Sequence, residues 1–114
     1  MNAAALDEII RNRRTIKPPM MGDAPVSEED LQAILENANW APTHGLTQPW
    51  RFRVIRGDAR GELADAFANL YETAIPIDEQ KEGKADKLRD MARLAPVVIL
   101  VCMERQKMEK IRTL

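Results

Sequence analysis

The residues of this 114-residue chain that are best suited to chemistry fall in two short segments, and the longer one covers positions 41–52. This segment contains the only histidine of the chain, His44, together with Gln48 and Trp50. A connection between two elements is normally short and polar. Because this one carries a histidine, two prolines and a tryptophan, we expect it to do more than join its neighbours.

His44 can be read as a metal ligand, as a general base, or as a neutral loop residue that forms hydrogen bonds. A metal site is disfavoured, because the chain has no second histidine and no cysteine or carboxylate at ligand spacing around His44. A nucleophilic pair is also disfavoured, because the single cysteine, Cys102, lies in an apolar run that is typical of a buried strand. Contact with a bound ligand and a plain structural role both stay open for His44.

Two further residues of the same segment have different interpretations. Trp50 is interpreted as a core residue that opens a strand, with Pro49 fixing the turn before it. Gln48 stands beside this anchor, and its side-chain amide offers a donor and an acceptor in a fixed position. We therefore treat Gln48, rather than Trp50, as the candidate ligand contact.

The shorter segment is Arg13-Arg14-Thr15, at the end of a first predicted helix. Two arginines at this place could simply neutralise the C-terminal end of the helix dipole. Alternatively, the planar guanidinium groups and the Thr15 hydroxyl could grip a phosphate, with each charge-assisted hydrogen bond contributing about 1.5–3 kcal/mol. The residues alone leave both interpretations open.

Composition excludes several classes of partner. With 17 basic and 18 acidic residues and a net charge of −1, the chain lacks the clustered basic face that non-specific nucleic-acid binding needs. The longest apolar run, 97–103, is too short to span a bilayer. The charge balance and the short apolar run therefore predict neither a nucleic-acid nor a membrane partner. A single cysteine permits no internal disulfide, so we expect a cytoplasmic protein.

The apolar pattern predicts an α+β protein with the element order α-α-β-α-α-β. Ser27 begins a capping-box-like motif, and Pro42 follows the helix that starts there. Pro76 and Pro96 end the later helices in the same way. The expected helices cover 3–13, 27–39 and the stretches around 63–71 and 88–95, and the expected strands cover 51–56 and 97–103.

The second strand raises a question of completeness. A seven-residue apolar run such as 97–103 is typical of a strand that is buried on both faces. Two strands do not form a sheet that hides such a run. We therefore expect the missing layers to come from a second copy of the chain or from a portion downstream of it.

Taken together, these motifs resemble the FMN-dependent nitroreductase family, and in particular its compact subgroup of small bacterial NAD(P)H nitroreductases. The pattern is arginine-arginine-hydroxyl at 13–15, a capped helix at 27–39, Ala-Pro-Thr-His at 41–44, and Gln-Pro-Trp-Arg-Phe at 48–52. The later Ala-Pro-Val-Val-Ile at 95–99 is similar to the second strand of that family. Each motif is weak alone, but the combination is specific and covers essentially the whole chain.

The resemblance implies a homodimeric α+β fold with FMN at the subunit interface, of which positions 1–114 form the N-terminal part. It implies that Arg13, Arg14 and Thr15 hold the ribityl phosphate and that His44 contacts the flavin. We expect Gln48, selected above for its side-chain amide, to be a further cofactor contact. It also implies ping-pong chemistry, in which NAD(P)H reduces the flavin and leaves before an acceptor such as a nitroaromatic or a quinone takes the electrons. No side chain is then expected to be catalytic, because the flavin carries the chemistry.

Three departures from the family pattern are visible. Many relatives have a flavin-bonding Asn where this chain has Leu46, and a member of the compact subgroup has Arg where this chain has Trp40. The later half of the family fold supplies further contacts to the flavin ring, and this chain stops after its second strand. An alternative to the flavoenzyme is therefore a truncated, non-catalytic family member that dimerises or binds a partner without flavin.

Overall fold

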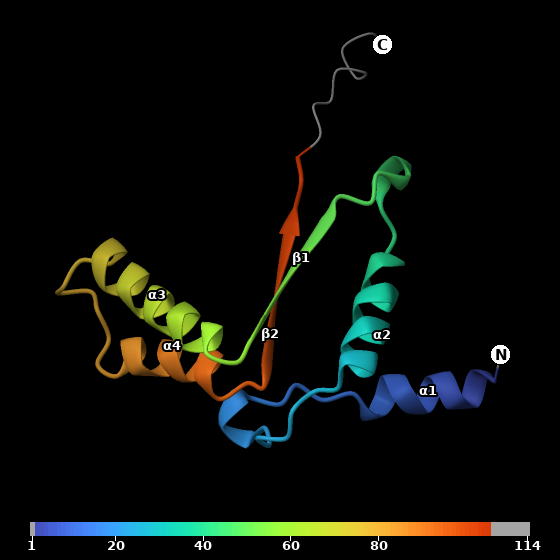
Figure 1. Ribbon diagram of the computed structural model, residues 1–114, viewed down its shortest axis with the longest axis horizontal. Coiled ribbons are helices and arrows are strands. Elements are labelled where there is room, and N and C mark those ends of the chain that lie inside the picture. The colour runs from blue at the N-terminus through green and yellow to red at the C-terminus, as the bar shows by residue number, and fades with distance from the viewer. Residues whose placement is uncertain (1, 106–114) are drawn as a thin grey trace, which may run out of the picture.

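The computed structural model describes residues 2–105, which form four α-helices, two short 3-10 helices and two strands (Figure 1). Their order confirms the predicted succession of helices and strands and the mixed helix-and-sheet class. The elements are α1 (Ala3–Asn12), η1 (Pro18–Met20), α2 (Glu28–Asn39), η2 (His44–Leu46), β1 (Trp50–Arg56), α3 (Ala59–Ala74), α4 (Lys84–Arg93) and β2 (Val97–Met103).

The second helix begins as its sequence predicts. The Oγ atom of Ser27 accepts a hydrogen bond from the backbone N–H of Asp30 at 3.0 Å, which satisfies one of the free donors of the first turn. Glu28, Glu29 and Asp30 all lie in this turn, where negative charge is favoured by the helix dipole. Leu31 is the buried residue of α2, so this helix turns one apolar position toward the rest of the chain.

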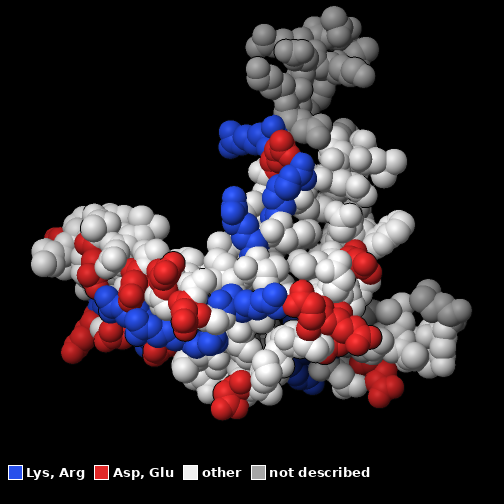
Figure 2. Space-filling model, in the orientation of Figure 1, with Lys and Arg blue, Asp and Glu red and all other residues white. Residues whose placement is uncertain are grey.

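The two strands form an antiparallel hairpin whose long connection contains α3 and α4. The register pairs Trp50 with Met103 at one end and Arg56 with Val97 at the other. Because side chains alternate between faces, one face of the hairpin carries apolar cross-strand pairs along its length. The other face carries the exposed Arg51 and Arg53, and Figure 2 shows basic side chains gathered along this part of the hairpin.

The expectation that β2 is buried on both faces is wrong for the residues described. Its first four residues are half-buried and its last three, including Cys102, are exposed. The reason is topological, because β2 pairs with β1 alone and the C-terminal half of the strand projects beyond the helices (Figure 1).

The apolar core of this part of the chain is small and consists mostly of alanine. The radius of gyration is 18.7 Å, whereas a compact domain of about 100 residues has a value of about 13 Å. Figure 1 shows the reason, because α3 and α4 lie at one end, the hairpin rises from the middle, and α1 projects at the other end. The buried apolar residues are Leu31, Ala64, Ala68, Ala92 and Ala95.

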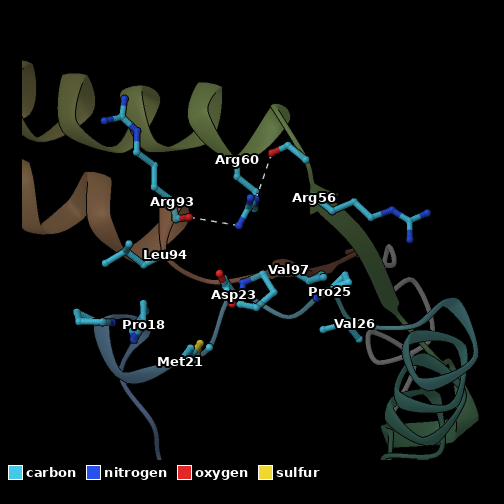
Figure 3. Close-up of a pocket in the computed structure, with 14 residues that line it drawn as sticks. Pro18, Met21, Asp23, Pro25, Val26, Arg56, Arg60, Arg93, Leu94 and Val97 are labelled. Atoms are coloured by element: carbon cyan, nitrogen blue, oxygen red, sulfur yellow. Dashed lines mark hydrogen bonds between the residues drawn. The ribbon is translucent and has the colours of Figure 1, made fainter.

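Polar contacts hold the α3–α4 end together. The guanidinium of Arg89 lies 3.1–3.6 Å from carboxylates of Asp65, Glu72 and Asp86, and these charges form a band along the two helices (Figure 2). Arg60 is half-buried and donates hydrogen bonds to the carbonyl oxygens of Gly57 at 3.1 Å and of Arg93 at 3.2 Å (Figure 3). Arg60 therefore joins the start of α3 to the end of α4.

Candidate functional site

The loop between α2 and β1 has an unusual backbone. Gly45, Leu46 and Gln48 all have positive φ values, of 61°, 54° and 43°. For a residue with a side chain this left-handed conformation costs on the order of 1–3 kcal/mol and persists only where the surroundings impose it. The backbone N–H of Gln48 donates to the Oγ1 atom of Thr43 at 3.3 Å, which is one contact that closes the loop on itself.

Two of the candidate residues lie in the same loop. His44 opens η2, and Gln48 is exposed at the outer end of the loop. Leu46 is 87% exposed, although its left-handed backbone is strained. Strain at an exposed position brings no packing gain within this chain, so it is the kind of feature that accompanies a ligand or partner contact.

Trp50 lies where the loop enters the sheet. It opens β1 and is half-buried, which agrees with its interpretation as an anchor. Its indole Nε1–H is buried and has no hydrogen-bond partner in the part of the chain that the structure describes. A buried donor of this kind costs about 1–3 kcal/mol when it stays unpaired. The first residue of β1 therefore carries a buried donor that is unsatisfied within residues 2–105.

The structure separates the two arginines of the shorter segment by role. Arg14 donates from Nη1 to the carbonyl oxygens of Arg11 at 2.8 Å and Arg13 at 2.9 Å, so it closes the C-terminal end of α1. Arg13 and Thr15 are exposed, and their side chains form no hydrogen bond with any residue from 2 to 105. The structural interpretation thus holds for Arg14, while Arg13 keeps a free guanidinium.

The chain does not bring these two segments together. Arg13–Thr15 follow α1 at the base of the molecule, whereas the loop 41–49 lies at the far end of α2 (Figure 1). The twelve residues of α2 correspond to a length of about 18 Å. A ligand held by both segments of one chain would have to extend along the whole of this helix.

The sequence around both segments contains no acidic residue. No aspartate or glutamate occurs in residues 9–22 or in residues 37–57, while both stretches contain arginines. Two arginines of the second stretch are paired with acidic residues from elsewhere in the chain, because Arg51 contacts Glu104 and Arg56 contacts Glu28. The exposed groups are the guanidinium of Arg13, the hydroxyl of Thr15 and the side-chain amide of Gln48. This donor set fits a phosphorylated, hydrogen-bonding cofactor such as FMN.

The structure also contains a cavity of about 450 Å³ that was not predicted from the sequence (Figure 3). It lies between the segment 18–26, the β1–α3 turn and the α4–β2 junction, and it includes none of the five candidate residues. Its arginines are already engaged, because Arg56 pairs with Glu28 at 2.6 Å and Arg93 pairs with Asp65 at 3.0 Å. The signal in the sequence was the cluster of prolines around position 18, because proline has a fixed φ and cannot continue an α-helix.

The model of the nitroreductase family matches residues 10–113, which include both candidate segments. The chain belongs to the nitroreductase family.

Individual relatives support this family assignment. The nitrobenzene nitroreductase of Ectopseudomonas oleovorans is 41% identical over 69 residues, which are 60% of this chain and 30% of that protein. YfhC of Bacillus subtilis, which carries an NAD(P)H nitroreductase name, is 28% identical over 110 residues, 96% of this chain and 55% of its own length. A crystal structure of a nitroreductase-like family protein from Bacillus cereus superposes with a TM-score of 0.68 and 28% identity, over 86% of this chain and 49% of that one.

These matches confirm the nitroreductase-like α+β fold, and they also define its extent. The chain spans about 30% to 55% of the length of the relatives that it matches. Among residues 2–105, none of the helices combines the length and the hydropathy that a bilayer crossing requires. The same residues contain no group of three or more His, Cys, Asp or Glu side chains arranged to hold a metal ion.

Proposed function

We propose that this nitroreductase-family chain is the FMN-binding N-terminal part of an NAD(P)H-dependent oxidoreductase that reduces nitroaromatic or quinone-like acceptors. The observation that carries the proposal is the family match over residues 10–113, which includes every candidate cofactor residue. The relatives with nitroreductase names support the reaction class.

The phosphate of the cofactor is assigned to Arg13, Arg14 and Thr15. Arg13 is the main contact, because its guanidinium is exposed and free of side-chain hydrogen bonds within residues 2–105. Arg14 adds positive charge while one of its amino groups, Nη1, caps α1. An exposed cation of this kind can form two parallel hydrogen bonds with phosphate oxygens.

The loop 41–49 is assigned to the flavin ring, through His44 and Gln48. The backbone N–H of Gln48 donates to the Oγ1 atom of Thr43, which ties the two ends of the loop together, and preorganisation of a loop lowers the entropy cost of binding. Bound FMN would accept electrons from NAD(P)H and pass them to the acceptor. The residues of the chain bind and orient the cofactor, and none of them needs to exchange a proton for that role.

The homodimer belongs to the same proposal. The candidate segments lie at opposite ends of α2 (Figure 1), so a cofactor at a subunit interface could contact one segment from each copy. In this arrangement the segment 13–15 of one copy and the loop 41–49 of the other would together form one cofactor site.

The test is a comparison of FMN with riboflavin by flavin fluorescence titration of the 114-residue chain. We expect FMN to bind at least tenfold more tightly, because only FMN carries the phosphate. Arg13→Ala should remove most of this difference, whereas Arg53→Ala, an exposed arginine on β1, should not. Equal affinities for the two flavins in the unaltered chain would remove the phosphate assignment.

The second candidate function is a non-catalytic family member that dimerises or binds a partner without flavin. The separation of the two candidate segments along α2 favours it, because neither end alone encloses a ligand. It is the conclusion to adopt if neither flavin binds.

A further inference from the structure

The cavity of about 450 Å³ beside the β1–α3 turn has the size and the mixed lining of a small-molecule site. It includes Arg56, the last residue of β1, whereas the loop 41–49 adjoins Trp50, the first residue of this strand. A strand of seven residues is about 20 Å long. The cavity is therefore separate from the loop that is assigned to the flavin ring.

Most of the cavity wall is apolar and rigid. The apolar lining includes Pro18, Pro19, Pro25, Pro96, Leu94 and Val97. Proline has a fixed φ, and in η1 the backbone N–H of Met21 donates to the carbonyl oxygen of Pro18 at 3.0 Å. Because η1 also contacts α4, this wall is shaped before any ligand arrives, which reduces the cost of binding.

Four charged residues line the cavity, but only two of them direct a charge toward it. Arg56 and Arg93 form ion pairs with carboxylates that are not part of the lining. Figure 3 shows the side chains of both residues pointing away from the cavity. The remaining charges are those of Arg60 and Asp23.

Arg60 presents one amino group without a partner. Its Nε atom donates to the carbonyl oxygen of Gly57 at 3.1 Å, and its Nη1 atom donates to those of Arg93 at 3.2 Å and of Ala95. A guanidinium has five N–H donors, of which these contacts occupy three. The two hydrogens of Nη2 have no partner among residues 2–105. The three carbonyl contacts hold the half-buried guanidinium in a fixed direction, toward the segment 18–26 (Figure 3).

Asp23 belongs to this facing segment. Its carboxylate is exposed and forms no hydrogen bond or ion pair with any residue from 2 to 105. It does not pair with Arg60, although both residues line the same cavity. Two opposite charges that share a cavity without contacting each other leave room for a ligand between them.

These charges select one class of ligand. A purely anionic molecule would be repelled by Asp23 and a purely cationic one by Arg60, and such repulsion is a source of specificity. We propose that this cavity binds a small apolar zwitterion of the α-amino acid class. The carboxylate of the ligand accepts hydrogen bonds from Nη2 of Arg60, and its ammonium group donates to the carboxylate of Asp23. Its apolar side chain then packs against the proline-rich wall.

The first experiment is an amide NMR titration of the isotope-labelled 114-residue chain with L-leucine and, separately, with L-phenylalanine. We expect saturable shifts at millimolar concentrations, centred on lining residues such as Gly22, Gly57 and Val97. If neither amino acid causes saturable shifts at these residues, the proposal is wrong.

Two analogues of leucine test the two charge contacts without altering the protein. L-Leucinamide lacks the carboxylate, and N-acetyl-L-leucine lacks the ammonium group. We expect each analogue to bind at least tenfold more weakly than L-leucine, because each loses one charge-assisted contact. An analogue that binds as well as L-leucine would contradict recognition of a zwitterion. The amide analogue also replaces a substitution of Arg60, whose contacts join α3 to α4.

The second experiment uses Asp23→Asn, which removes the charge and keeps the shape of the side chain. This variant should bind L-leucine at least tenfold more weakly, and it should discriminate less between L-leucine and N-acetyl-L-leucine. Asp58→Asn is the matched control, since Asp58 is exposed in the β1–α3 turn, caps no backbone group with its side chain and does not line the cavity. Equal affinities of Asp23→Asn and Asp58→Asn for L-leucine would overturn the assignment of Asp23.

Neither experiment involves a flavin. The cavity lining contains no residue of the segments 13–15 and 41–49, so saturating L-leucine should leave the affinity for FMN unchanged. Competition between L-leucine and FMN would place the amino acid in the cofactor site and contradict a separate site. The amino acid proposal and the flavin proposal can therefore fail independently.

Discussion

Arg14 donates a hydrogen bond from Nη1 to the carbonyl oxygen of Arg11 at 2.8 Å, while its neighbour Arg13 leaves its guanidinium free of hydrogen bonds to residues 2–105. Two arginines adjacent in sequence thus have different tasks. One closes a helix end, and the other is available to a ligand.

The first prediction concerns the different contacts of Arg13 and Arg14. Arg14→Ala should destabilise α1 by about 0.3–1 kcal/mol, because the last carbonyls lose a cationic donor. The measurement is amide hydrogen exchange over residues 3–12. Arg13→Ala should leave this exchange unchanged and instead weaken FMN binding. If Arg13→Ala accelerates exchange as much as Arg14→Ala does, the division of roles is wrong.

The second prediction concerns the strained backbone at Leu46. Leu46→Asn should raise the free energy of unfolding by up to about 1 kcal/mol, because Asn adopts positive φ more easily than Leu. Little packing is lost, since the Leu46 side chain is 87% exposed. The measurement is the thermal midpoint.

Ile77→Asn provides the control, because Ile77 is also highly exposed and is not among the described residues with positive φ. It should leave the midpoint unchanged or lower it slightly. A midpoint for Leu46→Asn that falls to the level of this control would show that the strain has no energetic consequence.

The third prediction concerns the alanines between α3 and α4. Ala68 has no exposed surface, so Ala68→Leu forces extra atoms into a closed contact and should destabilise the fold by about 1–3 kcal/mol. Ala66 is exposed on the same helix, and Ala66→Leu should change stability little. Urea unfolding of the two variants checks this, and equal midpoints would mean that the helices do not pack as described.

The fourth prediction concerns turnover. As the isolated 114-residue chain, the protein should oxidise NADPH or NADH with a quinone acceptor only slightly faster than free FMN does. Electron transfer needs the flavin ring held against the nicotinamide, and a misplacement of about 1 Å can cost on the order of 10²-fold. Residues 13–15 and 41–49 lie at opposite ends of α2 (Figure 1), so one chain fixes each end of the cofactor only loosely.

The assay uses saturating FMN, with free FMN at the same concentration as the blank. A rate far above this blank would show that copies of the short chain build a complete site. Such a result would support catalysis by the dimer and refute the expectation of low activity.

The order of helices and strands was determined by the sequence, because local signals decide it. Ser27 begins α2 through its own hydroxyl, and prolines follow α2, α3 and α4 because proline cannot continue a helix. The resemblance to the family could also be seen in the sequence, since each of its motifs, at 13–15, 41–44 and 48–52, is a short continuous segment. These features do not depend on how distant parts of the chain meet.

Burial and the assembly of the site were decided by tertiary structure. The pattern at 97–103 predicted an apolar strand. Whether Cys102 is exposed depends on how many strands pair with β2, and among the described residues only β1 pairs with it. Similarly, the resemblance assigned Arg13 and Gln48 to a cofactor site at a subunit interface, and the structure shows that within one chain the two residues lie at opposite ends of α2. Apolar periodicity tells which face of an element avoids water, and only the three-dimensional arrangement tells what covers it.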